Sequence, residues 1–365
     1  MMTAGKADLS YKFGAGRYLQ GRGVLEQAGV EISRFGRRPY VIGGPTALAL
    51  VRPRLHAALS AAGLETLMDV HPGAVCHEAA KARAAAARAG GCDVGVGVGG
   101  GRMMDFAKLV AYYLGSRVVN IPTSIATCAA YTPFSLVYTP AGQTIPGNFC
   151  YDLEVAAILV DLDIMANQPV RYVVSGMPDA MGKFLEIKRG HQDMSLADSS
   201  LNLYAGYLLT RFTYDRLTAL ADQVCQDVAA GQVTQALEDV VFIHLPLTGI
   251  ISALSRGTGQ SALAHELYYQ ARLLFTDESQ ATLHGEFVGC GMIMQLYYNG
   301  TPELIEPFTS LLRRLGAPDC LSRTGIRPTA ENCLKLLDAI KTSRRVSRDA
   351  AMLERLDAAF ALIAH

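Results

Sequence analysis

Short apolar runs alternate with alanine-rich, helix-forming runs over the first part of the chain. Apolar runs of this length predict strands that are buried on both faces of a sheet. We expect such strands over residues 39–44, 64–70, 92–100, 117–124 and 155–161. The helix-forming runs cover residues 46–62, with a break or a start near Pro53, and residues 77–90 and 102–115. Strands that alternate with helices indicate βαβ units and a parallel sheet.

The pattern of apolar positions changes twice along the chain. Residues 134–145 contain two extended runs on either side of Pro-Ala-Gly-Gln, and this predicts a hairpin. After Asp161 the apolar positions recur at helical spacing, and no run predicts a strand. The helices are expected over residues 172–189, 193–227, 236–254, 259–274, 283–297 and 303–315.

The fold class that follows is an α/β N-terminal domain with a parallel, Rossmann-like sheet, followed by an all-α C-terminal domain. We place the first domain at residues 1–165 and the second at residues 166–365, with the boundary between 162 and 170. A chain of 365 residues is long enough for two domains.

The composition of the chain indicates which kinds of binding partner and which cellular location to expect. Lys plus Arg and Asp plus Glu each number 33, so the charge balance gives no basic footprint, and we expect no nucleic-acid partner and no membrane partner. Eight cysteines without a CxxC pair, and an N-terminus without an apolar core, predict a cytoplasmic protein with reduced thiols. The longest apolar run, residues 240–254, contains His244 and Pro246 and predicts a buried helix.

The most informative local motif is GVGVGGGRMMDFAK, from Gly95 to Lys108. It follows a predicted strand and opens a predicted helix, the context in which glycines let the backbone approach a phosphate. The motif is not GxGxxG, so a tight structural turn remains the alternative to a phosphate cradle. Asp105 and Lys108 fall on the helix that follows, where an ordinary solvated helix face is also an adequate explanation.

The predicted helical half contains three candidate metal ligands. Asp179 lies in SGMPDAMGK among small residues, where an unpaired carboxylate would be costly to bury. His265 lies in SALAHELYY and His284 opens ATLHGEFVG. One carboxylate with two imidazoles is a plausible catalytic metal set that leaves positions open for substrate. Taken singly, a histidine in such a setting is more often a core or capping residue than a metal ligand.

The motifs occur together in an order that resembles one family. GVGGGRMMDFAK, IPTSIATCAAYTPFSLVYTPAG, GMPDAMGKF, AHELYY and LHGEFVG follow one another as in glycerol dehydrogenases. The chain therefore resembles the glycerol dehydrogenase branch of the iron-containing alcohol dehydrogenase superfamily. The resemblance implies a dehydroquinate synthase-like architecture, a small-molecule substrate and a homo-oligomer.

The resemblance also implies which residues bind the cofactor and the metal. The residues that would contact NAD or NADP are Gly99, Gly100, Gly101, Arg102, Met103, Asp105, Thr123, Ser124, Thr132, Phe134, Leu136 and Tyr138. Asp179, His265 and His284 match the metal triad, which holds zinc in glycerol dehydrogenases and iron in some relatives. The active site would lie between the two domains.

Two departures from the family pattern concern substrate and cofactor. Cys128 stands where glycerol dehydrogenases have an aspartate that contacts the polyol, and a thiol is a poor hydrogen-bond partner for a diol. Glycerol is therefore disfavoured, and Cys128 is either a substrate contact or a packing residue. After the strand at 39–44, Gly44 and Pro45 replace the carboxylate that NAD-dependent members often use for the ribose. NADP thus remains open, with Thr46 or an arginine near its extra phosphate.

The leading hypothesis is a metal-dependent dehydrogenase that interconverts a small alcohol, a polyol or a 2-hydroxy acid, and its carbonyl. One alternative is a non-redox cyclase or lyase of the dehydroquinate synthase type, which would need a basic cluster; the candidates are Lys183, Lys188 and Arg189. Another is a non-catalytic nucleotide-binding relative.

Overall fold

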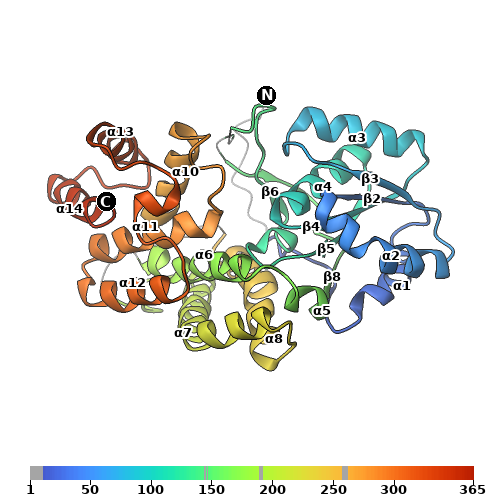
Figure 1. The fold of residues 1–365 in the computed structure, drawn as a ribbon, viewed down its shortest axis with the longest axis horizontal. Helices are drawn as coiled ribbons and strands as arrows, with labels where there is room; N and C mark the ends of the chain where they lie inside the picture. The colour runs from blue at the N-terminus through green and yellow to red at the C-terminus, as the bar shows by residue number, and fades with distance from the viewer. Residues whose placement is uncertain (1–10, 144, 146, 189–191, 257–261) are drawn as a thin grey trace.

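The computed structural model describes residues 11–143, 145, 147–188, 192–256 and 262–365. A sheet flanked by helices forms one side of the molecule, and a helical bundle forms the other (Figure 1). The sheet has six strands, all parallel, in the order β1-β8-β5-β4-β2-β3. Its strands are β1 (Tyr18–Gly21), β2 (Pro39–Gly43), β3 (Leu67–Val70), β4 (Val94–Gly99), β5 (Arg117–Pro122) and β8 (Ala157–Asp161).

Five of the six sheet strands match the predicted apolar runs, whereas β1, whose residues are only partly buried, was not predicted. β2, β4 and β8 are buried at every position, as strands covered on both faces must be. The helices α1 (Ala28–Ile32), α2 (Pro45–Ala61), α3 (His77–Ala89) and α4 (Gly101–Leu114) follow or connect the strands. The expected break near Pro53 is wrong. α2 continues through Pro53, which lies on its exposed face, where water can bond the carbonyl that proline leaves free.

The described residues after Asp161 contain no strand, which confirms the predicted helical half. Its helices are α5 (Leu162–Ala166), α6 (Val170–Lys188), α7 (Leu201–Ala229), α8 (Gln235–Phe242), α9 (Thr248–Ser255), α10 (Leu263–Leu274), α11 (His284–Asn299), α12 (Ile305–Arg314), α13 (Ala330–Lys341) and α14 (Ala350–Ala361). Short 3-10 turns η1 (Val24–Gln27), η2 (Cys128–Ala130), η4 (Pro302–Leu304) and η5 (Leu321–Thr324) connect elements in both halves. The division at residues 165 and 166 stays a prediction, although β8 ends at Asp161 and α6 begins at Val170.

The predicted hairpin is correct at its turn and wrong in its strand partner. Backbone bonds join Thr139 to Gln143 and Val137 to Ile145 around the Pro-Ala-Gly-Gln turn. The regular antiparallel pair, however, is β6 (Phe134–Ser135) with β7 (Phe149–Cys150). β7 has only two residues, too few to show a strand pattern in the sequence.

One long apolar stretch, Gln235–Ser255, has the length and composition of a membrane span. It is divided into α8, a π-helical turn η3 (Ile243–Leu247) and α9. The five residues of η3 are all buried, and 56% of the most apolar window is covered by the rest of the protein. The stretch therefore packs within the protein, as predicted for residues 240–254.

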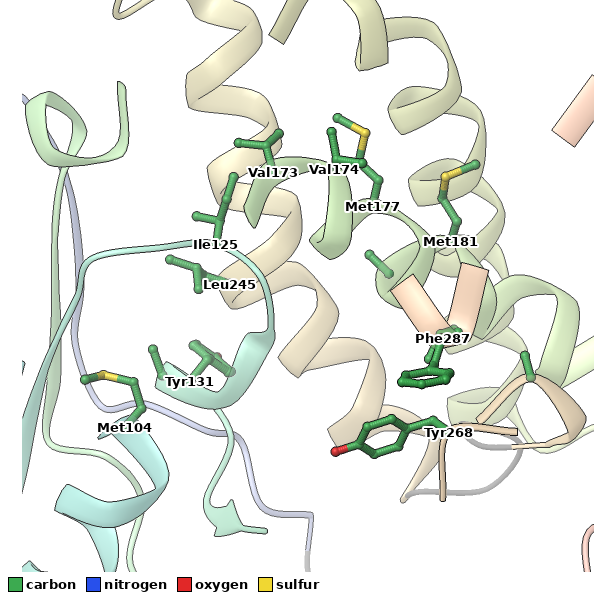
Figure 2. Packing of buried hydrophobic residues seen from close by; sticks show 14 of the residues in the cluster. Met104, Ile125, Tyr131, Val173, Val174, Met177, Met181, Leu245, Tyr268 and Phe287 are labelled. Atoms are coloured by element: carbon green, nitrogen blue, oxygen red, sulfur yellow. The ribbon is translucent and has the colours of Figure 1, made fainter. Parts of the chain in front are cut away.

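A continuous apolar cluster joins the two halves. Figure 2 shows Ile125 from the sheet side close to Leu245 of η3, with Val173 of α6 above them. All three are buried, as is Tyr131, which follows η2. A Cβ on Gly249 of α9 would lie 2.2 Å from the ring of Tyr131, so the helical half lies directly against η2. This packing brings the loops after β4 and β5 to the helices that bear the candidate metal ligands.

Candidate functional site

The glycine loop connects β4 directly to α4. Gly99 has a φ of 147°, a conformation that residues with side chains rarely adopt. A Cβ on Gly101 would lie 2.5 Å from Oγ1 of Thr127, so a side chain there would collide with the loop after β5. The loop thus requires glycine at two of the positions predicted to face the cofactor.

The N-terminus of α4 offers free backbone donors. No side chain caps the helix at Gly100, and the first bonds to the Gly100 carbonyl come from Met103 and Met104, at 2.9 and 3.1 Å. The N–H groups of Gly101 and Arg102 come before Met103 in the helix and have no acceptor within it. Free donors at the start of a 14-residue helix form a favourable site for a pyrophosphate.

The loop after β5 lies beside the glycine loop. The Thr123 N–H donates to the Gly99 carbonyl at 2.9 Å, which fixes the end of β5 against the end of β4. The Ser124 hydroxyl is buried and lies 3.1 Å from the position of a Cβ on Gly100. Thr123 and Ser124 therefore lie at the carboxyl ends of the strands, the edge where open parallel sheets bind ligands.

Asp105 and Lys108 form a buried pair, so the solvated helix-face explanation is wrong. Nζ of Lys108 lies 3.0 Å from Oδ1 of Asp105 and donates to the carbonyls of Thr132 and Phe134. Oδ2 of Asp105 accepts the Leu136 N–H at 3.2 Å. The pair holds the chain around β6 against α4, and it positions three of the residues predicted to flank the cofactor.

Tyr138 joins the sheet side to the candidate metal ligands. Its hydroxyl is hydrogen-bonded to Tyr268 of α10, and it lies near enough to Arg102 for that charge to affect its pKa. The ring of Tyr268 packs edge-on against His284, with 4.2 Å between ring centroids. Because burial is the main cause, the pKa of Tyr138 is raised and its hydroxyl stays protonated.

Three helices bring the candidate metal ligands together. Asp179 lies in α6, His265 lies in α10, and His284 is the first residue of α11. Oδ1 of Asp179 is 3.3 Å from Nε2 of His265 and 3.4 Å from Nε2 of His284. The ligand atoms all lie within 4.8 Å of one another, although 86 residues separate Asp179 from His265. The arrangement provides the mixed oxygen and nitrogen donors that zinc and non-haem iron bind.

Burial and neighbouring charges shift the pKa values of all three candidate ligands. Burial disfavours the Asp179 carboxylate, but Lys183 and the two histidines hold its pKa well below the usual value. Burial also disfavours protonated His265, yet Glu186 and Asp179 raise its pKa to about 9. Burial lowers the pKa of His284 despite Asp179. Asp179 is therefore ionised and available as an anionic ligand.

Glu186 orients His265. Its Oε2 lies 2.6 Å from Nδ1 of His265, and its Oε1 accepts the N–H groups of Ala262 and His265 at 2.7 and 3.1 Å. A carboxylate only accepts, so Nδ1 carries a proton, and Nε2 is the atom that faces Asp179 and can bind a metal once its own proton has left. This carboxylate–histidine pair is the arrangement that commonly supports a metal-binding imidazole.

Cys128 and Lys183 lie at the edge of the triad. Lys183 follows Asp179 by one turn of α6, and its Nζ lies 3.6 Å from Oδ1 of Asp179. Cys128 begins η2, close enough to Asp179 and Lys183 for both to affect the pKa of its thiol. Burial is the largest effect and raises that pKa to about 11, so Cys128 is a neutral thiol.

His244 is a further histidine between the two halves. It lies in the π-helical turn η3, and its Nδ1 is 2.8 Å from the Ile125 carbonyl. A carbonyl only accepts, so Nδ1 carries the proton, and the buried Nε2 has no partner among the described residues. Burial lowers the pKa of His244 to about 4, so the ring is neutral.

The sequence patterns did not predict the roles of Glu186 and His244. Glu186 comes seven residues after Asp179, which places it on the same side of α6, and this spacing is the only available signal. For His244 the signal is Pro246, because proline within an apolar helical run predicts a local irregularity. Neither signal identifies the partner, which depends on how distant segments pack.

Comparison with known proteins adds the following similarities. Residues 15–161 match the family model described as iron-containing alcohol dehydrogenase. The chain is 29% identical over 328 residues to glycerol dehydrogenase of Thermotoga maritima, which covers 85% of this chain and 84% of the relative. It is 29% identical over 283 residues to hydroxycarboxylate dehydrogenase A of Escherichia coli strain K12, covering 77% and 75%. A probable glycerol dehydrogenase of Sinorhizobium meliloti has the same fold, with a TM-score of 0.80, 23% identity and coverage of 96% and 99%.

Proposed function

We propose that the chain is a glycerol dehydrogenase-like member of the iron-containing alcohol dehydrogenase superfamily and that it oxidises a small alcohol with NAD or NADP. The similarities to glycerol dehydrogenase and to hydroxycarboxylate dehydrogenase A support metal-dependent alcohol oxidoreductase activity. The proposal extends to a polyol or a 2-hydroxy acid as substrate. The observation that carries it is the convergence of Asp179, His265 and His284 beside Cys128, in the segment that follows β5.

Asp179, His265 and His284 would hold a divalent cation, zinc or alternatively iron. A cation bound there would supply positive charge that stabilises the alkoxide of the alcohol and polarises the carbonyl in reverse. In the chain itself, Glu186 directs Nε2 of His265 towards the site, and Lys183 adds a second positive charge.

The loops of the sheet half would hold the dinucleotide. The free N–H groups of Gly101 and Arg102 would bind the pyrophosphate, with Thr123 and Ser124 beside it. The nicotinamide end would then point towards α10, because Tyr138 bonds to Tyr268 of α10 and lies near Arg102 at the start of α4. These contacts would orient the ring of a bound nicotinamide, which would supply the hydride acceptor. We also propose that the protein is a cytoplasmic homo-oligomer.

The test replaces His265 with Ala and measures both metal content and NAD(P)H formation. The wild-type protein is loaded with zinc or iron and screened against polyols, 2-hydroxy acids and their carbonyl partners. His265→Ala is expected to lose the metal and at least about 100-fold in turnover, because a ligand has been removed. His56→Ala, on the exposed face of α2, is the matched control and should change neither. A His265→Ala protein with normal metal content and turnover would refute the proposal.

The two alternative functions predict different outcomes in the same assay. A cyclase of the dehydroquinate synthase type would form product without net change in NAD(P)H. Of the three basic candidates, Lys183 lies beside Asp179, Lys188 pairs with Asp193 at 3.0 Å, and Arg189 lies outside the described residues. A non-catalytic relative would bind nucleotide but turn over none of the screened substrates.

A further inference from the structure

Lys183 is a buried cation whose charge the described residues only partly balance. It is 7% exposed, and its one salt bridge in the described part of the chain is with Asp179, at 3.6 Å between Nζ and Oδ1. That separation is longer than a hydrogen bond. A buried ammonium carries three donors and normally satisfies them. Lys183 lies one turn after a candidate metal ligand, so its ammonium is close to the place where a substrate would bind.

The groups around Lys183 supply little other negative charge. Its electrostatic neighbours are Asp179, Cys128, Glu186 and Tyr269. Cys128 is a neutral thiol, and Glu186 is already bound to His265 and to two backbone N–H groups. When Asp179 serves as a metal ligand, its charge is shared with the metal. Lys183 then has no carboxylate of its own.

With a divalent cation bound, the formal charges of the site do not cancel. A divalent cation brings two positive charges, and Asp179 and Glu186 each bring one negative charge. Neutral imidazoles of His265 and His284 add none, and Lys183 adds one positive charge. The buried cluster therefore carries one excess positive charge, which is costly in a site of low polarity. A neutral polyol leaves this charge uncompensated, whereas a monoanionic substrate cancels it.

We propose that Lys183 binds the carboxylate of the substrate, so that the preferred substrates are 2-hydroxy acids and the corresponding 2-oxo acids. This inference rests on the proposed function and names its substrate class. In a 2-hydroxy acid the carboxylate is bonded to the carbon that bears the hydroxyl, so its binding residue must adjoin the ligand triad, as Lys183 does. The departure at Cys128 agrees, because a thiol replaces the carboxylate that would repel an anion.

The reaction for this class balances without a further reactant. The carbinol C–H bond breaks, and its hydrogen leaves as hydride to the oxidised nicotinamide. The hydroxyl proton passes to solvent water, the carbon–oxygen double bond forms, and the products are a 2-oxo acid, the reduced dinucleotide and one proton. The Lys183 ammonium remains bound to the carboxylate throughout and exchanges no proton.

The experiment compares matched pairs of substrates that differ only in the anionic group: glycerate with glycerol, and lactate with 1,2-propanediol. Metal-loaded wild-type protein, Lys183→Met and Lys183→Arg are each assayed for kcat and KM. In wild type, kcat/KM for the acid should exceed that for the diol by about 100-fold, as expected for a charge-assisted bond in a buried site. Lys183→Met should remove most of this ratio through KM for the acid, and Lys183→Arg should restore part of it.

The control is Lys188→Met, the same substitution five residues further along α6, where the ammonium pairs with Asp193 outside the triad. It should leave the acid-to-diol ratio unchanged. Equal loss on acid and diol in Lys183→Met, or a wild-type preference for diols, would overturn the assignment and leave Lys183 a positioning residue for Asp179. Metal content of each variant separates that outcome from loss of the metal.

A binding measurement separates failure of this inference from failure of the proposed function. Oxamate, an isosteric mimic of a 2-oxo acid, is titrated into metal-loaded protein with and without NADH by calorimetry. If no substrate is turned over but oxamate binds at least tenfold more weakly to Lys183→Met, the anion site stands and the redox assignment falls. If oxamate binds wild type and Lys183→Met equally, the inference is refuted whatever the turnover.

Discussion

Glu186→Gln tests whether the carboxylate orients His265 for metal binding. Glu186 is fully buried, and three donors converge on its two oxygens: the N–H groups of Ala262 and His265, and Nδ1 of His265. Glutamine has nearly the same shape but only one acceptor oxygen. Its NH₂ group must therefore face at least one of these donors, and the charge on the Nδ1 bond is lost.

The expected loss is about 10- to 100-fold in metal affinity, or about 1.4 to 2.7 kcal/mol. This range agrees with the value of about 1.5 to 3 kcal/mol for a hydrogen bond to a charged group. Removing Glu186 also frees the imidazole to carry its proton on Nε2, the atom that faces Asp179 at 3.3 Å. A protonated Nε2 cannot bind a metal.

The assay is a competition titration of zinc between the protein and a chromogenic chelator, with circular dichroism to verify the fold. Glu266→Gln is the matched control, because Glu266 is the next residue after His265, is equally buried, and bonds to Gln270 and Arg345 instead. It should change the free energy of unfolding without changing zinc affinity. Zinc affinity within about twofold of wild type in folded Glu186→Gln, or an equal loss in Glu266→Gln, would refute the reasoning.

Three further predictions concern pH, cofactor choice and packing. Glu186 and Asp179 outweigh the effect of burial and raise the pKa of His265 to about 9 in the absence of metal. Because a proton and the metal compete for Nε2, zinc affinity should fall about tenfold for each pH unit below pH 9. Chelator titrations over a series of pH values measure this, and a flat profile would contradict it. Gly44→Asp should lower the NADP-to-NAD ratio of kcat/KM at least tenfold, because a carboxylate repels the extra phosphate of NADP. The substitution fits the structure, since a Cβ at this position would have its nearest neighbour at 3.7 Å. An unchanged ratio would place the ribose elsewhere. Gly285→Ala should destabilise the protein by about 3 kcal/mol or more in urea unfolding, since the Cβ would lie 1.6 Å from the Ser175 carbonyl oxygen; a change under about 1 kcal/mol would contradict the close approach of α6 and α11.

Most of the sheet was predictable because its central strands are apolar runs between helices, whereas β1, which is only partly buried, was not predicted. β4 and β8 were placed within two residues of their observed ends, since burial on both faces leaves a simple pattern. The partner of β6 was not predictable, because β7 contributes two residues and lies 14 residues away. Pro53 misled the prediction for α2, because its effect on a helix depends on exposure of the freed carbonyl.

The site shows the same contrast between local and distant information. The residues of the glycine loop could be selected from the sequence, because their role depends on one strand and the helix that follows it. The geometry of Asp179, His265 and His284 depends on how three helices pack, so spacing could propose the set but not their distances. Glu186 and Lys183 gain their roles only from that packing. Asp105 and Lys108 looked like surface residues because nothing local indicates that β6 covers them.

The central claim is that the Asp179, His265 and His284 cluster holds the metal required for hydride transfer. The most direct measurement removes metal from the wild-type protein with a chelator and then titrates zinc or ferrous iron while NAD(P)H formation is recorded. The account predicts no turnover in the metal-free protein and a linear rise that ends at a single equivalent of metal per chain. Full turnover in the metal-free protein, or a rise that continues through several equivalents, would contradict it.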